Sequence, residues 1–340
     1  IEGLNEIGYL TNDSLFDLEE KPESLTIMGA GYIGLEIAMA YNRLGVKVRI
    51  IEFTDRVLRT QTPDISEALE TQMQKEGIEV LPNFRAVKFE NVALSGVEGV
   101  GNETIIHCKC PDGSITKLTE KGKVVVATGT NPNTDKLGLE NIGLTLTKSG
   151  HIAVNENMET NLPTVFAAGD CANTPAFVYT AAYEGKTAVE SAFTSVNEQN
   201  KILPFGEDLG GAYSSLPWVV FTDPQVAGAG LDEAQAKAQN IAFEVSKIAL
   251  DNVPRAIAAN DTRGFIKLIR NTETDRLIGA RVVAPEGGEL IQQLSMAIKY
   301  GITVKDLADS FYPYLTLGEG IKLAAITFGK DVGKLSCCAS

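Results

Sequence analysis

This sequence has little cysteine and almost no histidine, and both shortages exclude classes of protein. Five cysteines in 340 residues, an odd number, do not make a disulfide framework. Free thiols at this density are typical of a reducing compartment, so we expect a cytoplasmic protein. Only His107 and His151 could add imidazole ligands, and no Cys-x-x-Cys spacing is present, which disfavours a tetrahedral zinc site.

Long apolar runs and an excess of positive charge are also missing. No apolar run reaches the roughly 18 residues of a membrane span, and we find no signal peptide pattern. The net charge is −14 and the isoelectric point is about 4.7, which argues against a nucleic-acid partner and against an anionic membrane surface. Hydrophobic residues still make up 44% of the chain, enough for more than one packed domain.

The clearest structural unit, residues 25–52, is predicted to be a βαβ unit. Residues 25–28 are apolar and suit a buried parallel strand. GAGYIG follows, and apolar residues then recur at helical spacing until Gly45, which stands where a C-terminal capping glycine is expected. Residues 46–50 alternate as a second strand.

GAGYIG fits the dinucleotide-binding pattern G-x-G-x-x-G. Gly29 permits the tight turn, Gly31 lets the backbone approach a pyrophosphate, and Gly34 lets helix and strand pack closely. The phosphates would meet the helix N-terminus, where free N–H groups favour anions. The remaining residues of this predicted cofactor site are Ala30, Tyr32 and Ile33.

The residues after the second strand leave the choice of nicotinamide cofactor open. Glu52 is placed to accept hydrogen bonds from a ribose 2′-hydroxyl, which favours NADH. Arg56 and Arg59 follow and could pair with a 2′-phosphate, which favours NADPH. Both interpretations stand at this stage.

The rest of the chain predicts further helices and strands. Residues 64–77 predict a helix with Asp64 as its N-cap and Gly77 as its terminator. Antiparallel strands are predicted for 84–118, a strand for 78–81, a buried strand for 123–127 and a short apolar strand for 164–168. A strand meander is predicted from about 214, and helices for 286–300 and 318–328.

Asp170, in the Gly-Asp turn after the predicted strand 164–168, is a second candidate binding residue. An aspartate there can accept hydrogen bonds from a polyol or a sugar, although an ordinary turn explains it equally well.

The terminal KLSCCAS places Cys337 and Cys338 side by side. Adjacent thiols make a strained disulfide, whereas two thiolates suit a soft metal ion, and two-coordinate Hg(II) would be satisfied by this pair alone. An incidental tail is the alternative. Cys108, Cys110 and Cys171 are predicted to be structural.

Several motifs carry a resemblance to a known family. In chain order they are GAGYIG, ATGTNPN at 127–133, TVFAAGDC at 164–171, FTDPQVAGAG at 221–230 and PYLTLGEG at 313–320. Together they resemble the FAD-dependent pyridine nucleotide-disulfide oxidoreductases over essentially the whole chain. DNVPRA at 251–256 and the terminal KLSCCA are similar to the mercuric reductase branch of that family.

The resemblance implies an α/β fold with Rossmann-like nucleotide-binding domains and a C-terminal α+β dimerisation domain, hence a homodimer. The implied boundaries are 1–22 for the end of an FAD domain and its linker, 23–135 for an NAD(P)-binding domain, 136–213 for a returning FAD or central segment, and 214–340 for the dimerisation domain with its Cys-Cys tail.

The resemblance also implies reduction of Hg(II) to Hg(0) by NAD(P)H through FAD. Cys337 and Cys338 would capture Hg(II) from its thiolate complexes and pass it to an inner cysteine pair. Tyr314 stands where the wider family has a catalytic histidine, if Glu319 matches the family's glutamate, and this disfavours a disulfide substrate. Tyr314 and Tyr32 are the implied catalytic tyrosines beside the metal.

Three further positions match cofactor contacts of the family. Gly129 lies in ATGTNPN, and Asp170 and Val178 correspond to FAD contacts. Thr130 stands where the family usually has arginine, a departure that removes a local cation.

Two parts of the family pattern are not in the chain: the first G-x-G-x-x-G, which holds the FAD pyrophosphate, and the inner Cys-x4-Cys pair. Because the chain begins at Ile1 without methionine, we expect both to lie upstream in a longer protein, and we expect the 340-residue chain not to reduce mercury by itself. Two alternatives stay open, a disulfide or quinone reductase of the same fold and a non-catalytic thiol metal-binding protein.

Overall fold

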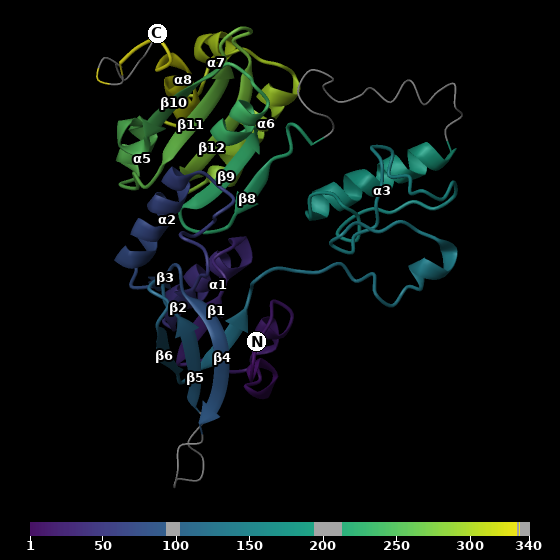
Figure 1. Cartoon of the computed structure of the whole chain (residues 1–340). Helices are drawn as coiled ribbons and strands as arrows, with labels where there is room; N and C mark the ends of the chain where they lie inside the picture. Colours follow the sequence, from purple (N-terminus) through teal and green to yellow (C-terminus); the bar gives the residue numbers. More distant parts are fainter. Residues whose placement is uncertain (93–102, 194–212, 332, 334–340) are drawn as a thin grey trace. The chain divides into compact units, whose positions relative to one another are not determined.

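The computed structural model describes residues 1–92, 103–193, 213–331 and 333. The chain divides into two compact units, one formed by Ile1–Thr128 with Tyr213–Ser340 and the other by Gly129–Ala212 (Figure 1). None of the helices in these described ranges is long and apolar enough to cross a membrane.

A parallel sheet of four strands forms the nucleotide-binding part of the first unit. Its strand order is β3-β2-β1-β7, and every neighbouring pair is parallel. The strands are β1 (Ser24–Met28), β2 (Lys47–Ile51), β3 (Glu79–Leu81) and β7 (Lys123–Val126), and the helices are α1 (Tyr32–Arg43) and α2 (Pro63–Lys75). The predicted βαβ unit is therefore confirmed.

The ends of α1 and α2 show which capping predictions hold. Gly45 has φ +82°, and the next N–H, of Val46, donates to the Tyr41 carbonyl at 3.0 Å, so the predicted glycine terminus of α1 is confirmed. The prediction of Asp64 as the N-cap of α2 is wrong, because Thr62 is the N-cap and Pro63 is the first helical residue. Proline suits that position, since its fixed φ is helical and an N–H there would have no hydrogen-bond partner within the helix.

Both faces of the parallel sheet are covered, as its apolar strands require. On one face, Leu25 and Ile27 pack with Leu35 of α1 and Ile65 of α2. On the other face, a three-stranded antiparallel sheet contributes Phe89 and its neighbours. That sheet consists of β4 (Arg85–Val92), β5 (Glu103–Lys109) and β6 (Ile115–Glu120), as the alternation of residues 84–118 predicts.

The C-terminal part of the first unit is a five-stranded antiparallel sheet with order β10-β11-β12-β9-β8. Its strands are β8 (Trp218–Val220), β9 (Gln225–Gly230), β10 (Phe243–Ala249), β11 (Phe265–Asn271) and β12 (Leu277–Ala284). Its helices are α4 (Glu233–Ala238), α5 (Pro254–Ala258), α6 (Gly287–Lys299), α7 (Val304–Asp309) and α8 (Glu319–Ile326). The predicted antiparallel strands and both predicted helices are confirmed, but the strands do not form a simple meander, because β9 pairs with β12 and not with β10.

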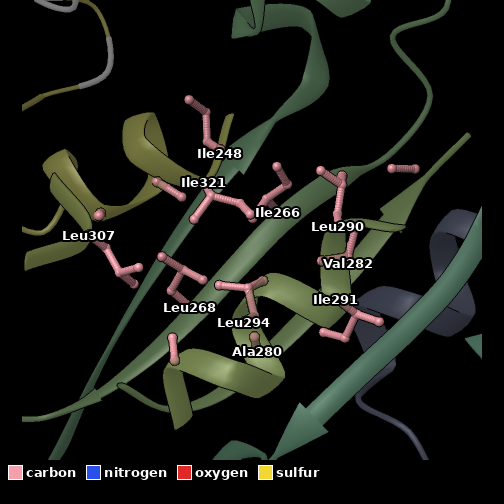
Figure 2. Packing of buried hydrophobic residues seen from close by; sticks show 14 of the residues in the cluster. Ile248, Ile266, Leu268, Ala280, Val282, Leu290, Ile291, Leu294, Leu307 and Ile321 are labelled. Atoms are coloured by element: carbon pink, nitrogen blue, oxygen red, sulfur yellow. The ribbon is translucent and has the colours of Figure 1, made fainter. Parts of the chain in front are cut away.

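One face of this sheet packs on helices and the other on the nucleotide-binding part. Figure 2 shows the helix-side core, in which Ile266 and Leu268 of β11 meet Leu294 of α6. Phe265, one residue before Ile266, belongs instead to the core around α1 and α2. Because successive strand residues point to opposite faces, Lys267 lies on the same side as Phe265, facing α2.

The second unit contains η3 (Leu139–Ile142), α3 (Val178–Phe193) and a small apolar cluster formed by Leu144, Ile152, Ala167 and Ala172. The predicted strand 164–168 is wrong, since only an isolated bridge between Glu159 and Phe166 forms there. A strand needs a neighbour along its length, and the described part of this unit offers single bridges only.

The ionised Asp64 carboxylate is expected to stabilise the folded protein in a pH-dependent way. Burial alone raises the pKa of Asp64, but the hydrogen bond from Thr62, the charge of Lys267 and the hydrogen bonds from Lys247 and Lys267 outweigh burial and lower the pKa from 3.8 to about 2. The folded-state pKa lies below the unfolded one, so this stability is complete above about pH 5 and is lost as the pH falls towards 2.

Between pH 5 and pH 2, the free energy of unfolding should therefore fall by about 2 kcal/mol more in the original chain than in Asp64→Asn. Urea unfolding at a series of pH values measures this difference. Asp17→Asn, at an exposed position, is the control and should retain the full loss. An Asp64→Asn variant with the original pH profile would contradict the assignment.

Candidate functional site

The first and third glycines of GAGYIG lie in a turn where the backbone packs too closely for a side chain. Gly29 has φ +103°, and a Cβ atom there would lie 2.5 Å from the Ala127 carbonyl oxygen. A Cβ atom on Gly34 would lie 2.1 Å from the Gly29 carbonyl oxygen. Both positions therefore need glycine, for the reasons that the motif predicts.

Gly31 differs, because its surroundings are open. It is the N-cap of α1 with φ −75°, and a Cβ atom there would meet no atom within 4 Å. The N-terminus of α1 follows with unpaired amide groups and the positive end of the helix dipole. A diphosphate can therefore approach the backbone at Gly31, so the residues present fit a dinucleotide.

Glu52 lies beside this turn, and its carboxylate stabilises the turn through hydrogen bonds. The side chain is 5% exposed. Its oxygens accept hydrogen bonds from the Ala30 N–H at 2.6 Å and from the Thr54 N–H at 2.7 Å. A carboxylate has about four acceptor sites, so two donors leave capacity for a ribose hydroxyl.

The two arginines after β2 have different surroundings. The Arg56 guanidinium donates to the carbonyl oxygens of Arg59 and Gln61, at 3.3 and 3.2 Å, and so holds the loop together. Arg59 is 55% exposed and pairs with Asp55 at 2.8 Å. Arg59 is therefore the arginine available to an incoming phosphate.

A cavity of about 240 Å³ beside Gly29 is a part of the site that sequence reasoning missed. Phe53, Phe84 and Arg85 line it, together with the ends of β1 and β2. Two aromatic rings and a guanidinium can stack on a flat heterocycle. Phe53 could have been predicted at the site, because it follows Glu52 directly in the sequence. Phe84 and Arg85 could not, because only the tertiary structure brings them to the cavity.

The predicted FAD contacts lie in the second unit. Asp170 is exposed after Gly169, which has φ +78°, and the Gly169 N–H donates to the buried Glu184 carboxylate at 2.7 Å. Val178, the first residue of α3, is 89% exposed, and Gly129 has φ +125°. Glu184 supports the Gly-Asp turn and was not predicted.

The predicted catalytic tyrosines are both accessible. Tyr32 is the first residue of α1 and is 53% exposed, and Tyr314 is 64% exposed. Glu319 begins α8, and among the described residues its buried Oε2 atom has no hydrogen-bond partner. Cys337 and Cys338 lie outside the residues that the structure describes.

The described cysteines have structural surroundings. Cys108 is buried in the core between the two sheets, and burial raises the pKa of its thiol to about 11, so it is an unreactive thiol. The Cys171 Sγ atom lies 3.4 Å from the Ala168 carbonyl oxygen. Within the described ranges, no three His, Cys, Asp or Glu side chains are grouped to hold a metal ion.

Comparison with known families agrees with this geometry. The pyridine nucleotide-disulphide oxidoreductase model matches residues 1–185, and the model of the dimerisation domain of these proteins matches residues 216–325. The chain belongs to the pyridine nucleotide-disulphide oxidoreductase family. The predicted family and its α/β fold with a C-terminal dimerisation domain are thereby confirmed.

Curated relatives from within this oxidoreductase family include mercuric reductases. The chain is 38% identical to the mercuric reductase of Staphylococcus aureus over 339 residues, which cover 100% of this chain and 58% of that protein. It is 42% identical to the mercuric reductase of Shewanella putrefaciens over 344 residues, 100% of this chain and 56% of that protein. The chain thus spans less than two thirds of these relatives.

Solved structures show the same oxidoreductase fold. LpdA from Mycobacterium tuberculosis superposes with a TM-score of 0.78 and 28% identity, covering 94% of this chain and 65% of that one. The HOCl-induced flavoprotein disulfide reductase RclA from Escherichia coli superposes with a TM-score of 0.79 and 24% identity, covering 95% and 68%. The latter similarity concerns the fold alone.

Proposed function

We propose that this chain is the nicotinamide-binding and mercury-capturing part of an enzyme that reduces Hg(II) to Hg(0). The open glycine cradle at Gly31 supports the nicotinamide half of the proposal. The similarity of the whole chain to mercuric reductases, together with the terminal KLSCCA, supports the mercury half.

NAD(P)H would bind at the C-terminal edge of the parallel sheet. The amides at the start of α1 would hold the pyrophosphate, and Gly31 gives it room to approach. The adenosine ribose would lie at Glu52, next to the cavity between Phe53 and Phe84. Glu52 stabilises the glycine turn in the absence of a ligand, because its carboxylate accepts a hydrogen bond from the Ala30 N–H.

FAD, when bound, supplies two-electron transfer between the nicotinamide and thiols. The turn at Asp170 and the exposed start of α3 at Val178 would contribute part of its binding surface. Glu184 holds that turn through the Gly169 amide, and Gly129 gives the chain a positive φ that other residues adopt rarely.

The substrate, Hg(II) delivered as a thiolate complex, would be taken up by Cys337 and Cys338 through thiolate exchange. Exchange between thiolates moves the ion without releasing it into water. Tyr314 and Tyr32 are exposed phenols that would donate a hydrogen bond to a metal-bound thiolate.

We further propose that the protein acts as a cytoplasmic homodimer. The dimerisation-domain match supports this assembly, as do large exposed side chains on the same domain, namely Met296, Tyr300 and Phe311. Free Cys108, Cys110 and Cys171 suit a reducing compartment.

The test compares the complete protein with the 340-residue chain. We expect NADPH oxidation that depends on Hg(II) in the complete protein and none in the isolated chain, which should still bind NAD(P)H. A complete protein that turned over a small disulfide but not Hg(II) would instead support a disulfide reductase. An isolated chain that bound no dinucleotide would overturn the assignment of the cradle.

A further inference from the structure

Lys267 is a buried cation that the proposed chemistry does not use. Its side chain is 2% exposed in the middle of β11. The Nζ atom donates to Glu233 Oε1 at 2.7 Å, to Asp64 Oδ1 at 3.1 Å and to Thr62 Oγ1 at 3.1 Å. A buried ammonium group is retained only where such partners replace its water, so these contacts hold it in one place.

Two of the three partners form the start of α2. Thr62 is the N-cap of the helix, and its hydroxyl also donates to Asp64 Oδ1 at 2.6 Å. Thr62 is also the last residue of the loop that leaves β2, here called the 53–62 loop. Lys267 therefore ties the end of this loop to the five-stranded sheet, far away in the sequence.

The 53–62 loop is cross-linked to both α2 and the glycine turn. The Val57 N–H donates to Glu70 at 3.0 Å, and the Val57 carbonyl accepts from Ser66 at 2.6 Å. The Leu58 N–H donates to the Ala30 carbonyl at 2.9 Å. A shift of α2 would therefore move the middle of the loop relative to the glycine turn.

The loop carries the exposed Arg59, which follows Leu58, the residue whose N–H is bound to Ala30 of the glycine turn. Arg56 holds the Arg59 carbonyl, so the backbone of Arg59 follows the loop. Glu52 and Gly29 also have anchors outside the loop: Glu52 accepts from the Ala30 amide as well as from Thr54, and the Gly29 N–H donates to the Ile51 carbonyl at 2.9 Å. The groups that meet the phosphates and the 2′-hydroxyl therefore keep these anchors when α2 shifts, whereas the position of Arg59 depends on the loop itself.

We propose that Lys267 is a positioning residue that sets the selectivity between NADPH and NADH by clamping α2 and the 53–62 loop, which places Arg59 at the ribose 2′-phosphate. The inference rests on the proposed nicotinamide site. It concerns the dinucleotide alone and requires neither mercury nor flavin.

The test measures NADPH and NADH dissociation constants of the 340-residue chain by calorimetric titration. The original chain should prefer NADPH. Lys267→Met should weaken NADPH binding about tenfold and change NADH binding less than about twofold. The matched control is Lys247→Met, since Lys247 also pairs with Asp64 at 3.1 Å but is 44% exposed, and it should keep the original preference.

Two further variants separate positioning from loss of fold. Lys267→Met removes the ion-pair partner of the partly exposed Glu233, so Lys267→Met/Glu233→Gln removes that charge while Lys247 still neutralises Asp64. It should lose the NADPH preference while remaining folded. In an Arg59→Ala background, Lys267→Met should change the NADPH to NADH ratio no further.

The outcomes distinguish the two proposals. If the original chain binds neither dinucleotide, the proposed site itself fails. If it binds both and the folded Lys267 variants keep the original ratio, or if Lys267→Met acts equally with and without Arg59, the role of Lys267 is wrong while the site stands.

Discussion

Replacing Gly31 by alanine is expected to abolish dinucleotide binding while leaving the melting temperature almost unchanged. The backbone of Gly31 has φ −75°, which alanine adopts freely, and the added methyl group would meet no protein atom within 4 Å. That methyl would instead occupy the space through which a pyrophosphate approaches the α1 amides. We expect the affinity for NAD(P)H to fall at least about a hundredfold and the melting temperature to move by less than about 3 °C.

Gly34→Ala is the matched comparison in the same motif. Its Cβ atom would lie 2.1 Å from the Gly29 carbonyl oxygen, a backbone atom that cannot move aside cheaply. We therefore expect a loss of about 3 kcal/mol in the free energy of unfolding. Titration with NADPH and thermal unfolding by circular dichroism measure both effects. A Gly31→Ala chain that binds NADPH normally would show that the pyrophosphate does not lie at this turn.

Replacing Cys337 and Cys338 together by alanine is expected to remove mercury capture by the 340-residue chain. Two adjacent thiolates complete the coordination of a two-coordinate soft ion, whereas a single thiol competes poorly with thiols in solution. Equilibrium dialysis against Hg(II) in excess glutathione should show one ion bound per original chain and none per double variant. In the complete protein the same change should prevent mercury resistance in cells.

The other cysteines provide the control for this experiment. Cys110→Ser should bind mercury as the original chain does, because Cys110 lies at the end of an antiparallel strand beside the buried Cys108. If the Cys337→Ala/Cys338→Ala chain retained its mercury while Cys110→Ser lost it, the capture site would lie at the three-stranded sheet instead.

Sequence reasoning was most successful where a local pattern carries the information. The βαβ unit, its glycine turn and the glycine end of α1 were all predicted, because each depends on hydrophobic periodicity or on a φ value that glycine alone adopts readily. It failed at residues 164–168, where an apolar run resembles a strand but has no neighbouring strand to pair with. The N-cap of α2 was predicted too late in the chain. Asp64 is a favoured N-cap residue, but Pro63 already begins the helix, so the N-cap is Thr62.

The sequence by itself determined the family, the position of the dinucleotide motif and the candidate metal thiols, since these are properties of residue type and spacing. Only the tertiary structure decided which arginine is accessible, which glycine faces open space, and that Phe84 and Arg85 join Phe53 at the cavity. It also brought Lys267 to the start of α2, although Lys267 lies 203 residues after Asp64 in the sequence. The physical reason is that burial and partnership depend on contacts between residues distant in sequence, which hydrophobic periodicity and motif spacing do not encode.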